Sequence, residues 1–201
     1  MIRILLADDQ HLVRGALAAL LGMQDDFDVV ASVADGAAAV DAAVSLQPDV
    51  ALLDIEMPLL DGISATAAIR GQAPAVRVMI LTTFGRPGYL RRAMDAGAAG
   101  FMVKDAPPDR LADAVRQIHA GRTVVDPALA VASLSSGPSP LTDRESDVLR
   151  AAEHGGTVSD IARELILSEG TVRNYLSAAI GKTGARTRAE AARLARENGW
   201  L

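Results

Sequence analysis

The 201-residue sequence contains no cysteine, and this absence excludes two kinds of stabilising site. Neither a disulfide framework nor a zinc–cysteine site can form. The three histidines are scattered along the chain, which argues against a histidine-rich metal centre. No apolar run approaches the roughly 20 residues that a membrane-spanning helix needs, and the N-terminus lacks the basic and apolar segments of a signal peptide. We therefore expect a soluble, cytoplasmic protein.

Lysine is almost as scarce as cysteine. Of the 20 basic residues, all except Lys104 and Lys182 are arginines. A solvated surface of this chain would be expected to carry arginine, so a lysine marks a position where a compact, flexible point charge has a use. A site that binds a phosphoryl group is one such position.

The length allows one large or two small domains, and an apolar content of 50% is enough for a substantial core. The net charge of −5 lies entirely in residues 1–138, which hold 11 basic and 16 acidic residues. Residues 139–201 hold nine of each and are neutral. Because this part has no basic excess, any binding of nucleic acid there must depend on where its arginines are placed.

Four apolar runs without polar alternation each end in polar side chains. The runs cover residues 2–7, 50–53, 76–81 and 100–103, and they end in Asp8-Asp9, Asp54, Thr82-Thr83 and Lys104. Such runs are typical of parallel strands buried on both faces, whose carboxyl ends carry the ligand chemistry. One polar residue at a strand end has a purely structural explanation, but four coordinated ones do not. We expect these side chains to converge at one edge of a sheet.

The rest of the chain alternates strand and helix signals and then changes character. A helix after the first strand, a further strand over 27–33, a helix over 36–46 and three later helical segments complete five strand–helix units, which predict a parallel sheet with right-handed crossovers. Residues 122–138 end in a Ser-, Gly- and Pro-rich stretch typical of a linker. Residues 139–201 are helical throughout, with the short helices and tight turns of a helix-turn-helix module. The predicted division is thus 1–121, 122–138 and 139–201.

Three carboxylates at one edge would repel one another unless a cation joined them. Oxygen ligands suit Mg²⁺, which takes one or two carboxylates and keeps several waters. Asp54 can then attack a phosphoryl donor as a carboxylate nucleophile. Mg²⁺ and Lys104 would offset the charge on the transferred oxygens, and the Thr82 hydroxyl could donate to the acyl phosphate that results.

These motifs identify residues 1–121 as similar to response-regulator receiver domains. The matching residues are Asp8-Asp9, Asp54, Met57-Pro58, Asp61-Gly62, Thr82-Thr83 and Lys104. The resemblance implies a flavodoxin-like, five-stranded parallel sheet of strand order 2-1-3-4-5, followed here by an all-α helix-turn-helix domain.

The resemblance also implies roles for individual residues. Asp54 would be the phosphoacceptor, and Mg²⁺ would be held by Asp8, Asp9, Asp54 and the backbone carbonyl of Glu56. Thr82 would be the switch hydroxyl, Lys104 would contact the phosphate, and Phe101 would be the aromatic that moves with Thr82. Glu56 and Phe84 are expected to tune dephosphorylation from beside the site.

Residues 169–182 predict a helix with two contrasting faces. Val172, Leu176, Ala179 and Ile180 share the face that packs inward. Arg173, Asn174 and Ser177 lie on the opposite face, and arginine and asparagine are the side chains that recognise guanine and adenine edges in the major groove. The helix N-terminus, with Ser168 and Thr171, suits a DNA phosphate.

This region resembles the LuxR-type helix-turn-helix of the NarL/FixJ class. The resemblance is carried by Leu141-Thr142, Arg144-Glu145, Ile161-Ala162, Leu165, Ser168-Glu169-Gly170-Thr171-Val172-Arg173-Asn174, Lys182, Arg188 and Glu190-Ala191. It implies that Arg173, Asn174 and Ser177 face bases, and that Thr171, Tyr175 and Lys182 lie nearer phosphates. The sequence departs from the pattern at Tyr175, where histidine is common, and at Gly181, which is expected to end the helix early.

The resulting hypothesis is a two-component response regulator, which is not an enzyme acting on other molecules. A sensor histidine kinase would phosphorylate Asp54 with Mg²⁺, and the homodimer that forms would bind two half-sites on double-stranded DNA. The sequence leaves two alternatives for the surface through which the protein dimerises. One uses the first and fifth predicted helices, with Leu12, Ala16, Leu20, Leu111 and Val115. The other uses the fourth helix and the fifth strand.

Two rival hypotheses are weighed against this one. In the first, the regulator works without phosphorylation and the acidic site is vestigial, although the complete acidic set argues against it. In the second, the protein is a phosphatase with an aspartyl nucleophile. Glu56 supplies a second carboxylate two residues after Asp54, yet the helix-turn-helix half would then have no role.

Overall fold

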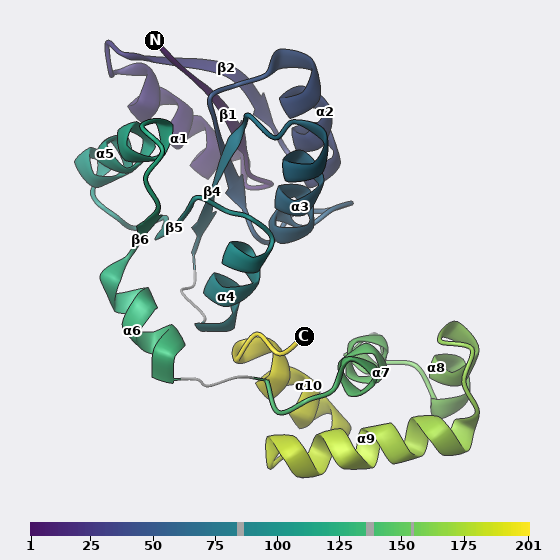
Figure 1. Ribbon diagram of the computed structural model, residues 1–201. Coiled ribbons are helices and arrows are strands. Elements are labelled where there is room, and N and C mark those ends of the chain that lie inside the picture. The colour runs from purple at the N-terminus through teal and green to yellow at the C-terminus, as the bar shows by residue number, and fades with distance from the viewer. Residues whose placement is uncertain (84–86, 136–138, 154) are drawn as a thin grey trace. The chain divides into compact units, whose positions relative to one another are not determined.

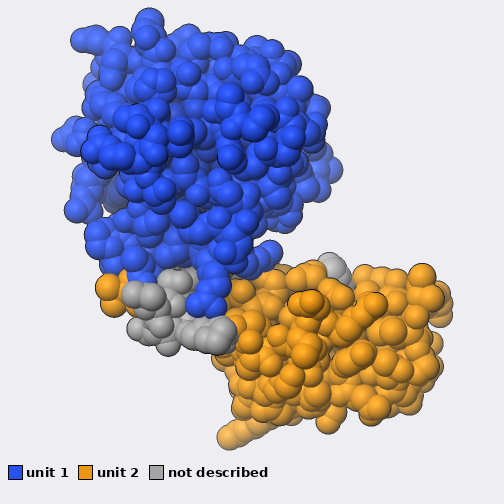
Figure 2. Space-filling view, viewed as in Figure 1, with its two compact units in different colours: residues 1–85, 90–130 blue, residues 86–89, 131–201 orange. Residues whose placement is uncertain are grey.

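The computed structural model describes residues 1–83, 87–135, 139–153 and 155–201, with the side chains of 87 and 132–135 left out of the description. Phe84, expected beside the acidic site, lies outside the described residues. The chain divides into two units, residues 1–85 with 90–130 and residues 86–89 with 131–201 (Figure 2).

Within the described residues, the first unit contains one parallel sheet of six strands. Its order is β2-β1-β3-β4-β5-β6. The strands are β1 (Ile2–Ala7), β2 (Phe27–Val33), β3 (Val50–Asp54), β4 (Arg77–Thr82), β5 (Gly100–Val103) and β6 (Val124–Val125) (Figure 1). The predicted parallel sheet and the order of its first five strands are confirmed.

The sixth strand lies inside the segment predicted to be a linker, and here the structure differs from the prediction. Val124 and Val125 pair with Gly100 and Phe101 of β5. An edge strand leaves backbone groups unpaired, and two β-branched residues are well suited to pair with them. Helix α6 (Pro127–Ser135) follows directly. The first unit therefore continues to residue 130 instead of ending at 121.

Helices cover both faces of this sheet (Figure 1). One face carries α1 (His11–Gly22) and α5 (Pro108–His119), and the other carries α2 (Gly36–Leu46), α3 (Gly62–Gln72) and α4 (Pro87–Asp95). On the first face, side chains of α1 and α5 pack with strand residues into one buried cluster. Its members include Leu6, Leu17, Leu21, Leu52, Leu111, Val115 and Ile118. Burial of this apolar surface is the main force that holds the strands in register.

The register of the strands brings the predicted polar groups to one edge. Ala7 of β1 pairs with Leu53 of β3, so the residues that follow, Asp8 and Asp54, are level with each other. In the same way Thr82 pairs with Val103, the residue before Lys104. The site is thus built by strand pairing over the length of the sheet.

The second unit is formed by α7 (Asp143–Glu153), α8 (Val158–Glu164), α9 (Glu169–Thr183) and α10 (Arg188–Glu197). One residue from each helix illustrates its apolar core: Leu149, Ile161, Leu176 and Ala195 are all buried. No helix in the described parts of the chain has both the length and the apolar character to span a membrane.

Helix α9 does not end early, so the prediction made from Gly181 is wrong. The helix continues to Thr183, and Gly184 follows in the left-handed conformation (φ +67°) with its N–H donating to the Ile180 and Gly181 carbonyls. A glycine inside a helix costs about 1 kcal/mol relative to alanine. Packing of the buried face of α9 outweighs that cost, because tertiary contacts supply most of a helix's stability in a protein.

A buried carboxylate joins α7 to α9. The Thr142 N–H donates to the carboxylate of Glu145 (2.7 Å), and Lys182 Nζ lies 2.7 Å from the same Glu145 oxygen. Burial raises the pKa of Glu145, but the hydrogen bonds from Lys182 and Thr142 outweigh burial, and the net effect is a lowered pKa. The ion pair therefore stabilises the charged form of Glu145 and holds the last turn of α9 against the start of α7.

Gly181→Ala should stabilise the second unit by up to about 1 kcal/mol, because it removes backbone entropy from the unfolded chain. A Cβ built at Gly181 meets nothing within 4 Å. Urea unfolding followed by the fluorescence of Trp200, the single tryptophan, measures this unit. Gly184→Ala is the matched control and should destabilise it, since φ is +67° there. Destabilisation by both changes would contradict the prediction.

Lys182→Met should destabilise the second unit by about 1 kcal/mol, because it leaves the Glu145 carboxylate buried with fewer partners. The lowered pKa of Glu145 gives the sign of the pH dependence. Stability from this pair is complete above the ordinary carboxyl pKa and is lost as the pH falls through the lowered pKa. Unfolding of both proteins monitored at Trp200, at about pH 7 and about pH 4, should show a smaller acid-induced loss in the variant. Equal losses would mean that the pair contributes nothing.

Candidate functional site

Three carboxylates meet at the carboxyl edge of the sheet. Asp8 and Asp9 follow β1, and Asp54 is the last residue of β3. Asp8 and Asp54 are buried, with relative exposures of 1% and 5%, and Asp9 is exposed. One oxygen from each carboxylate lies within 4.8 Å of the others. The structure thus brings together the three acids that the sequence placed at separate strand ends.

Lys104 supplies the positive charge of this cluster. Its backbone N–H donates to the Thr82 carbonyl (2.8 Å), which continues the β4–β5 pairing by one residue. Its Nζ atom lies 2.7 Å from an oxygen of Asp8 and 3.0 Å from an oxygen of Asp54. One ammonium group therefore contacts both buried carboxylates.

The electrostatics of the cluster are unbalanced. Burial raises the pKa of Asp54, Lys104 acts in the opposite direction, and the neighbouring Asp8 raises it again. The net result is a pKa above the ordinary range for aspartate. One lysine does not fully compensate three carboxylates, so a second cation would stabilise their charged forms. The donors are all oxygen atoms, which is the ligand set of hard divalent metal ions, and the cluster can hold such an ion.

The loop after β3 is shaped by Asp61 and Gly62. The Asp61 carboxylate accepts the backbone N–H groups of Ile63 and Ser64 (2.9 Å each) and so caps α3. The Gly62 N–H donates to the Ile55 carbonyl (2.9 Å). A Cβ at Gly62 would lie 1.9 Å from the Asp54 carbonyl oxygen, so only glycine fits there. The Asp-Gly pair therefore positions the loop that follows Asp54.

Three further residues were predicted for this site, and they lie in three different environments: Thr82 at the sheet edge, Phe101 within the sheet and Glu56 in an exposed loop. Thr82 ends β4 at the same edge and is 5% exposed. Phe101 is fully buried within β5, beside Ile80, and lies in the sheet instead of at its edge. Glu56 is exposed in the loop after β3. Its carboxylate is not part of the acidic cluster found among the described residues.

Sequence reasoning missed Arg14 of α1. Its guanidinium donates to the backbone carbonyl of Asp8 and so ties the first helix to the acidic turn. The available signal was weak, because an arginine in the helix after a strand end is common. A contact to a backbone carbonyl leaves no residue-type pattern in the sequence.

Helix α9 presents the two faces that were predicted. Val172, Leu176 and Ala179 are buried, whereas Arg173, Asn174 and Ser177 are exposed. At its start, the Ser168 hydroxyl accepts the Thr171 N–H (3.1 Å) and shares a hydrogen bond with the Thr171 hydroxyl (2.8 Å). Tyr175 is half-buried against the core of the unit.

Both basic side chains of α9 are held by carboxylates. The Arg173 guanidinium donates to Glu169 one helical turn earlier (2.6 Å), and Lys182 donates to Glu145 (2.7 Å). The Glu169–Arg173 spacing of four residues is the favourable orientation for a helical ion pair. The spacing is a signal that the sequence itself carries.

Comparison with protein families supports both units. Residues 4–116 match the response regulator receiver domain, and residues 139–195 match the bacterial regulatory proteins of the luxR family. Together the two models cover most of the chain.

Several known proteins are similar to this chain over its whole length. The uncharacterized transcriptional regulatory protein YvfU of Bacillus subtilis is 44% identical over 201 residues, which is 100% of both chains. The DNA-binding transcriptional activator DevR/DosR of Mycobacterium tuberculosis is 35% identical and covers 98% of this chain and 95% of its own. The crystal structure of the response regulator ChrA of a heme-sensing two-component system aligns with a TM-score of 0.60 at 35% identity, over 100% of this chain and 98% of that one. The chain therefore belongs to the response regulators that join a receiver domain to a LuxR-type DNA-binding domain, and it is a DNA-binding transcriptional regulator of this family.

Proposed function

We propose that phosphorylation of Asp54 by a sensor histidine kinase, with Mg²⁺, switches this regulator to a DNA-binding homodimer. The observation that carries the proposal is the position of Lys104 Nζ, which contacts both Asp8 and Asp54 at the edge of the sheet where Thr82 ends β4. This cluster combines a nucleophile, metal ligands and a cation for a phosphoryl group. A regulator bound to DNA would work in the cytoplasm.

The residues of the cluster have distinct parts in the transfer. Asp8, Asp9, Asp54 and the backbone carbonyl of Glu56 would hold Mg²⁺, which when bound offsets the charge of the transferred phosphoryl oxygens. An Asp54 oxygen attacks phosphorus as the bond to the kinase histidine breaks. Lys104 then pairs with a phosphoryl oxygen, and the Thr82 hydroxyl donates to another.

The switch that follows is a change in the surroundings of Thr82. As its hydroxyl turns to the phosphoryl group, the packing around it would change, and Phe101, buried on the adjacent strand, would move with it. A local change of charge thereby biases a packed element between two arrangements. The phosphatase alternative has less support, because Glu56 is exposed and apart from the acidic cluster described here.

DNA recognition is assigned to α9. Its exposed Arg173, Asn174 and Ser177 would contact base edges in the major groove. Phosphate contacts would come from the start of the helix and from the side chains that flank the exposed face. These residues are Ser168, Thr171, Tyr175 and Lys182, of which Lys182 would share its ammonium group with Glu145.

Helix α1, which belongs to one of the two expected dimer faces, carries exposed apolar side chains that could contact a second copy. Leu12 is 85% exposed and Leu20 is 38% exposed. Leu111 and Val115 were expected on the same face, but they are buried in the core of the unit and are not accessible to a second copy. A dimer would place two copies of α9 at half-sites about one helical turn apart.

Beryllofluoride mimics the phosphoryl group on a carboxylate, so with Mg²⁺ it should convert the wild-type protein from monomer to dimer in sedimentation velocity. Asp54→Ala should remain monomeric, because the acceptor oxygen is lost. Glu56→Gln is the matched control, since it removes a neighbouring carboxylate and keeps the backbone carbonyl, and it should dimerise as wild type does. No change in any of the three proteins would overturn receiver dimerisation and favour a regulator that works without phosphorylation.

Glu169→Gln should raise the affinity for DNA of unrelated sequence about two- to threefold, the equivalent of about 0.5 kcal/mol, because Arg173 no longer has to leave a carboxylate. Fluorescence anisotropy with a labelled duplex at several salt concentrations measures the change. Glu164→Gln removes the same charge from an exposed glutamate outside the ion pairs described here, and it corrects for net charge. Equal effects of the two substitutions would show that the ion pair does not restrain Arg173.

A further inference from the structure

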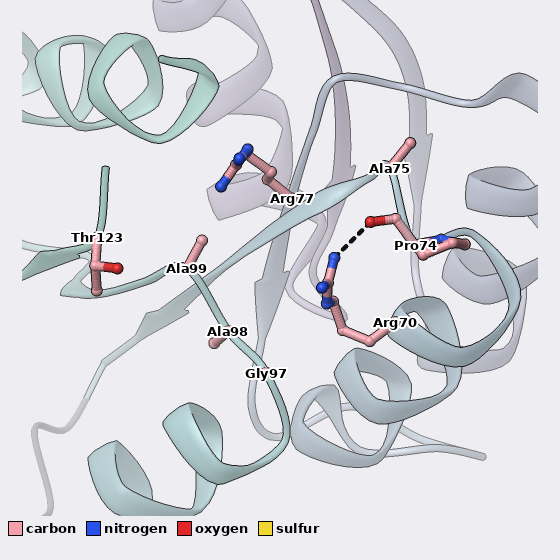
Figure 3. A pocket seen from close by; sticks show the side chains of 8 residues that line it. All are labelled: Arg70, Pro74, Ala75, Arg77, Gly97, Ala98, Ala99 and Thr123. Atoms are coloured by element: carbon pink, nitrogen blue, oxygen red, sulfur yellow. Dashed lines mark hydrogen bonds between the residues drawn. The ribbon is translucent and has the colours of Figure 1, made fainter. Parts of the chain in front are cut away.

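A cavity of about 360 Å³ opens at the edge of the sheet opposite the acidic cluster (Figure 3). It lies where the amino ends of β4 and β5 meet the chain that enters β6. Arg70 comes from the last turn of α3, Arg77 is the first residue of β4, and Thr123 precedes β6. Gly97 and Ala99 belong to the turn that leads into β5. All these residues are within the first unit.

The charge of this cavity is uncompensated. No acidic residue lines it. The Arg77 guanidinium has no hydrogen-bond or ion-pair partner among the described residues. Arg70 donates to the Pro74 carbonyl oxygen (2.6 Å), a neutral acceptor that leaves the arginine charge unpaired (Figure 3). Arg116 of the same unit shows the usual alternative, because it pairs with Asp26 at 2.8 Å. Two unpaired guanidinium groups thus flank one cavity in the acidic half of the chain.

Two glycines let the arginine side chains lie close to the backbone turns. Gly97 has φ +95°, and a Cβ there would approach Arg70 Cγ to 3.1 Å. Gly121 has φ +89°, and a Cβ there would lie 3.4 Å from an Arg77 Nη atom. Positive φ disfavours any side chain at these positions. The first turn therefore lies against the stem of Arg70, and the second lies against the guanidinium group of Arg77.

The groups that remain for a ligand are mostly donors. The N–H groups of Gly97, Ala98 and Ala99 already donate to backbone carbonyls. The Arg77 guanidinium, the Arg70 N–H groups that do not donate to Pro74 and the Thr123 hydroxyl line the cavity together with Ala75 and Ala99 (Figure 3). A set of cationic donors with a small apolar wall fits an anion that carries a short organic part.

We propose that this cavity binds a small phosphate monoester. A guanidinium group binds phosphate through paired N–H donors, and two of them match the charge and the three terminal oxygens of a monoester better than they match a single carboxylate. The volume lies in the range of small-ligand sites. Because Arg77 begins β4 and Thr82 ends it, this ligand binds at the far end of the strand that carries the switch hydroxyl and does not compete with phosphorylation of Asp54.

The test is titration of the full chain with glycerol 3-phosphate, inorganic phosphate and uncharged glycerol, followed by amide NMR. EDTA removes divalent metal and so suppresses binding at the acidic cluster. We expect saturable shifts at the amides of Gly97, Ala99 and Thr123 with glycerol 3-phosphate, weaker ones with phosphate and none with glycerol. Unchanged amides up to about 10 mM ester, or shifts confined to Asp9 and Lys104, would overturn the proposal.

Substitutions separate the cavity from general attraction of anions. Arg77→Gln should weaken the binding of glycerol 3-phosphate at least about tenfold, since a charge-assisted contact is lost. Arg110→Gln removes the same charge from an exposed arginine of α5 that does not line this cavity, and it should leave the affinity unchanged. Amide spectra report whether each variant is folded. Equal affinity in wild type and Arg77→Gln, or equal weakening in both variants, would refute a site in this cavity.

Discussion

The contact of one ammonium group with two buried carboxylates is the interaction on which the receiver unit depends. Lys104 reaches Asp8 and Asp54 only because β1, β3, β4 and β5 end level with one another. Without that cation, the two buried acids would be costly to keep charged. Under the proposed phosphorylation of Asp54, an added phosphoryl group would change the partners of Lys104. Stability and the proposed switch would then rest on the same charges.

Both lysines of the chain are used in the same way. Lys104 contacts buried aspartates in the first unit, and Lys182 contacts the buried Glu145 in the second. Several arginines of the described surface pair instead with exposed acids, as Arg173 does with Glu169. A compact ammonium on a flexible stem acts as a point charge that can reach these buried carboxylates. Both lysines of this lysine-poor chain thus hold buried carboxylates, and Lys104 also lies in the proposed phosphorylation site.

Much of the candidate site could be predicted because its residues stand at the ends of uninterrupted apolar runs. Parallel strands bring such ends together, so Asp8, Asp54, Thr82 and Lys104 were expected at one edge before any geometry was known. The faces of α9 followed in the same way from helical periodicity. What could not be predicted depended on partners distant in sequence. Strand β6 forms by pairing with the edge of β5. Helix α9 continues beyond Gly181, because its buried face and Lys182 contact residues of other helices.

The sequence by itself determined the first five strands and the helices that alternate with them along the chain, the polar residues at the strand ends and the side of α9 that faces solvent. These follow from periodicity and from the geometry of parallel strands, which act locally along the chain. Only the tertiary structure decided that Leu111 and Val115 are core residues, that Glu145 is the partner of Lys182, and that Arg70 and Arg77 flank one cavity. These facts depend on which elements pack together, and burial and pairing of side chains are properties of that packing.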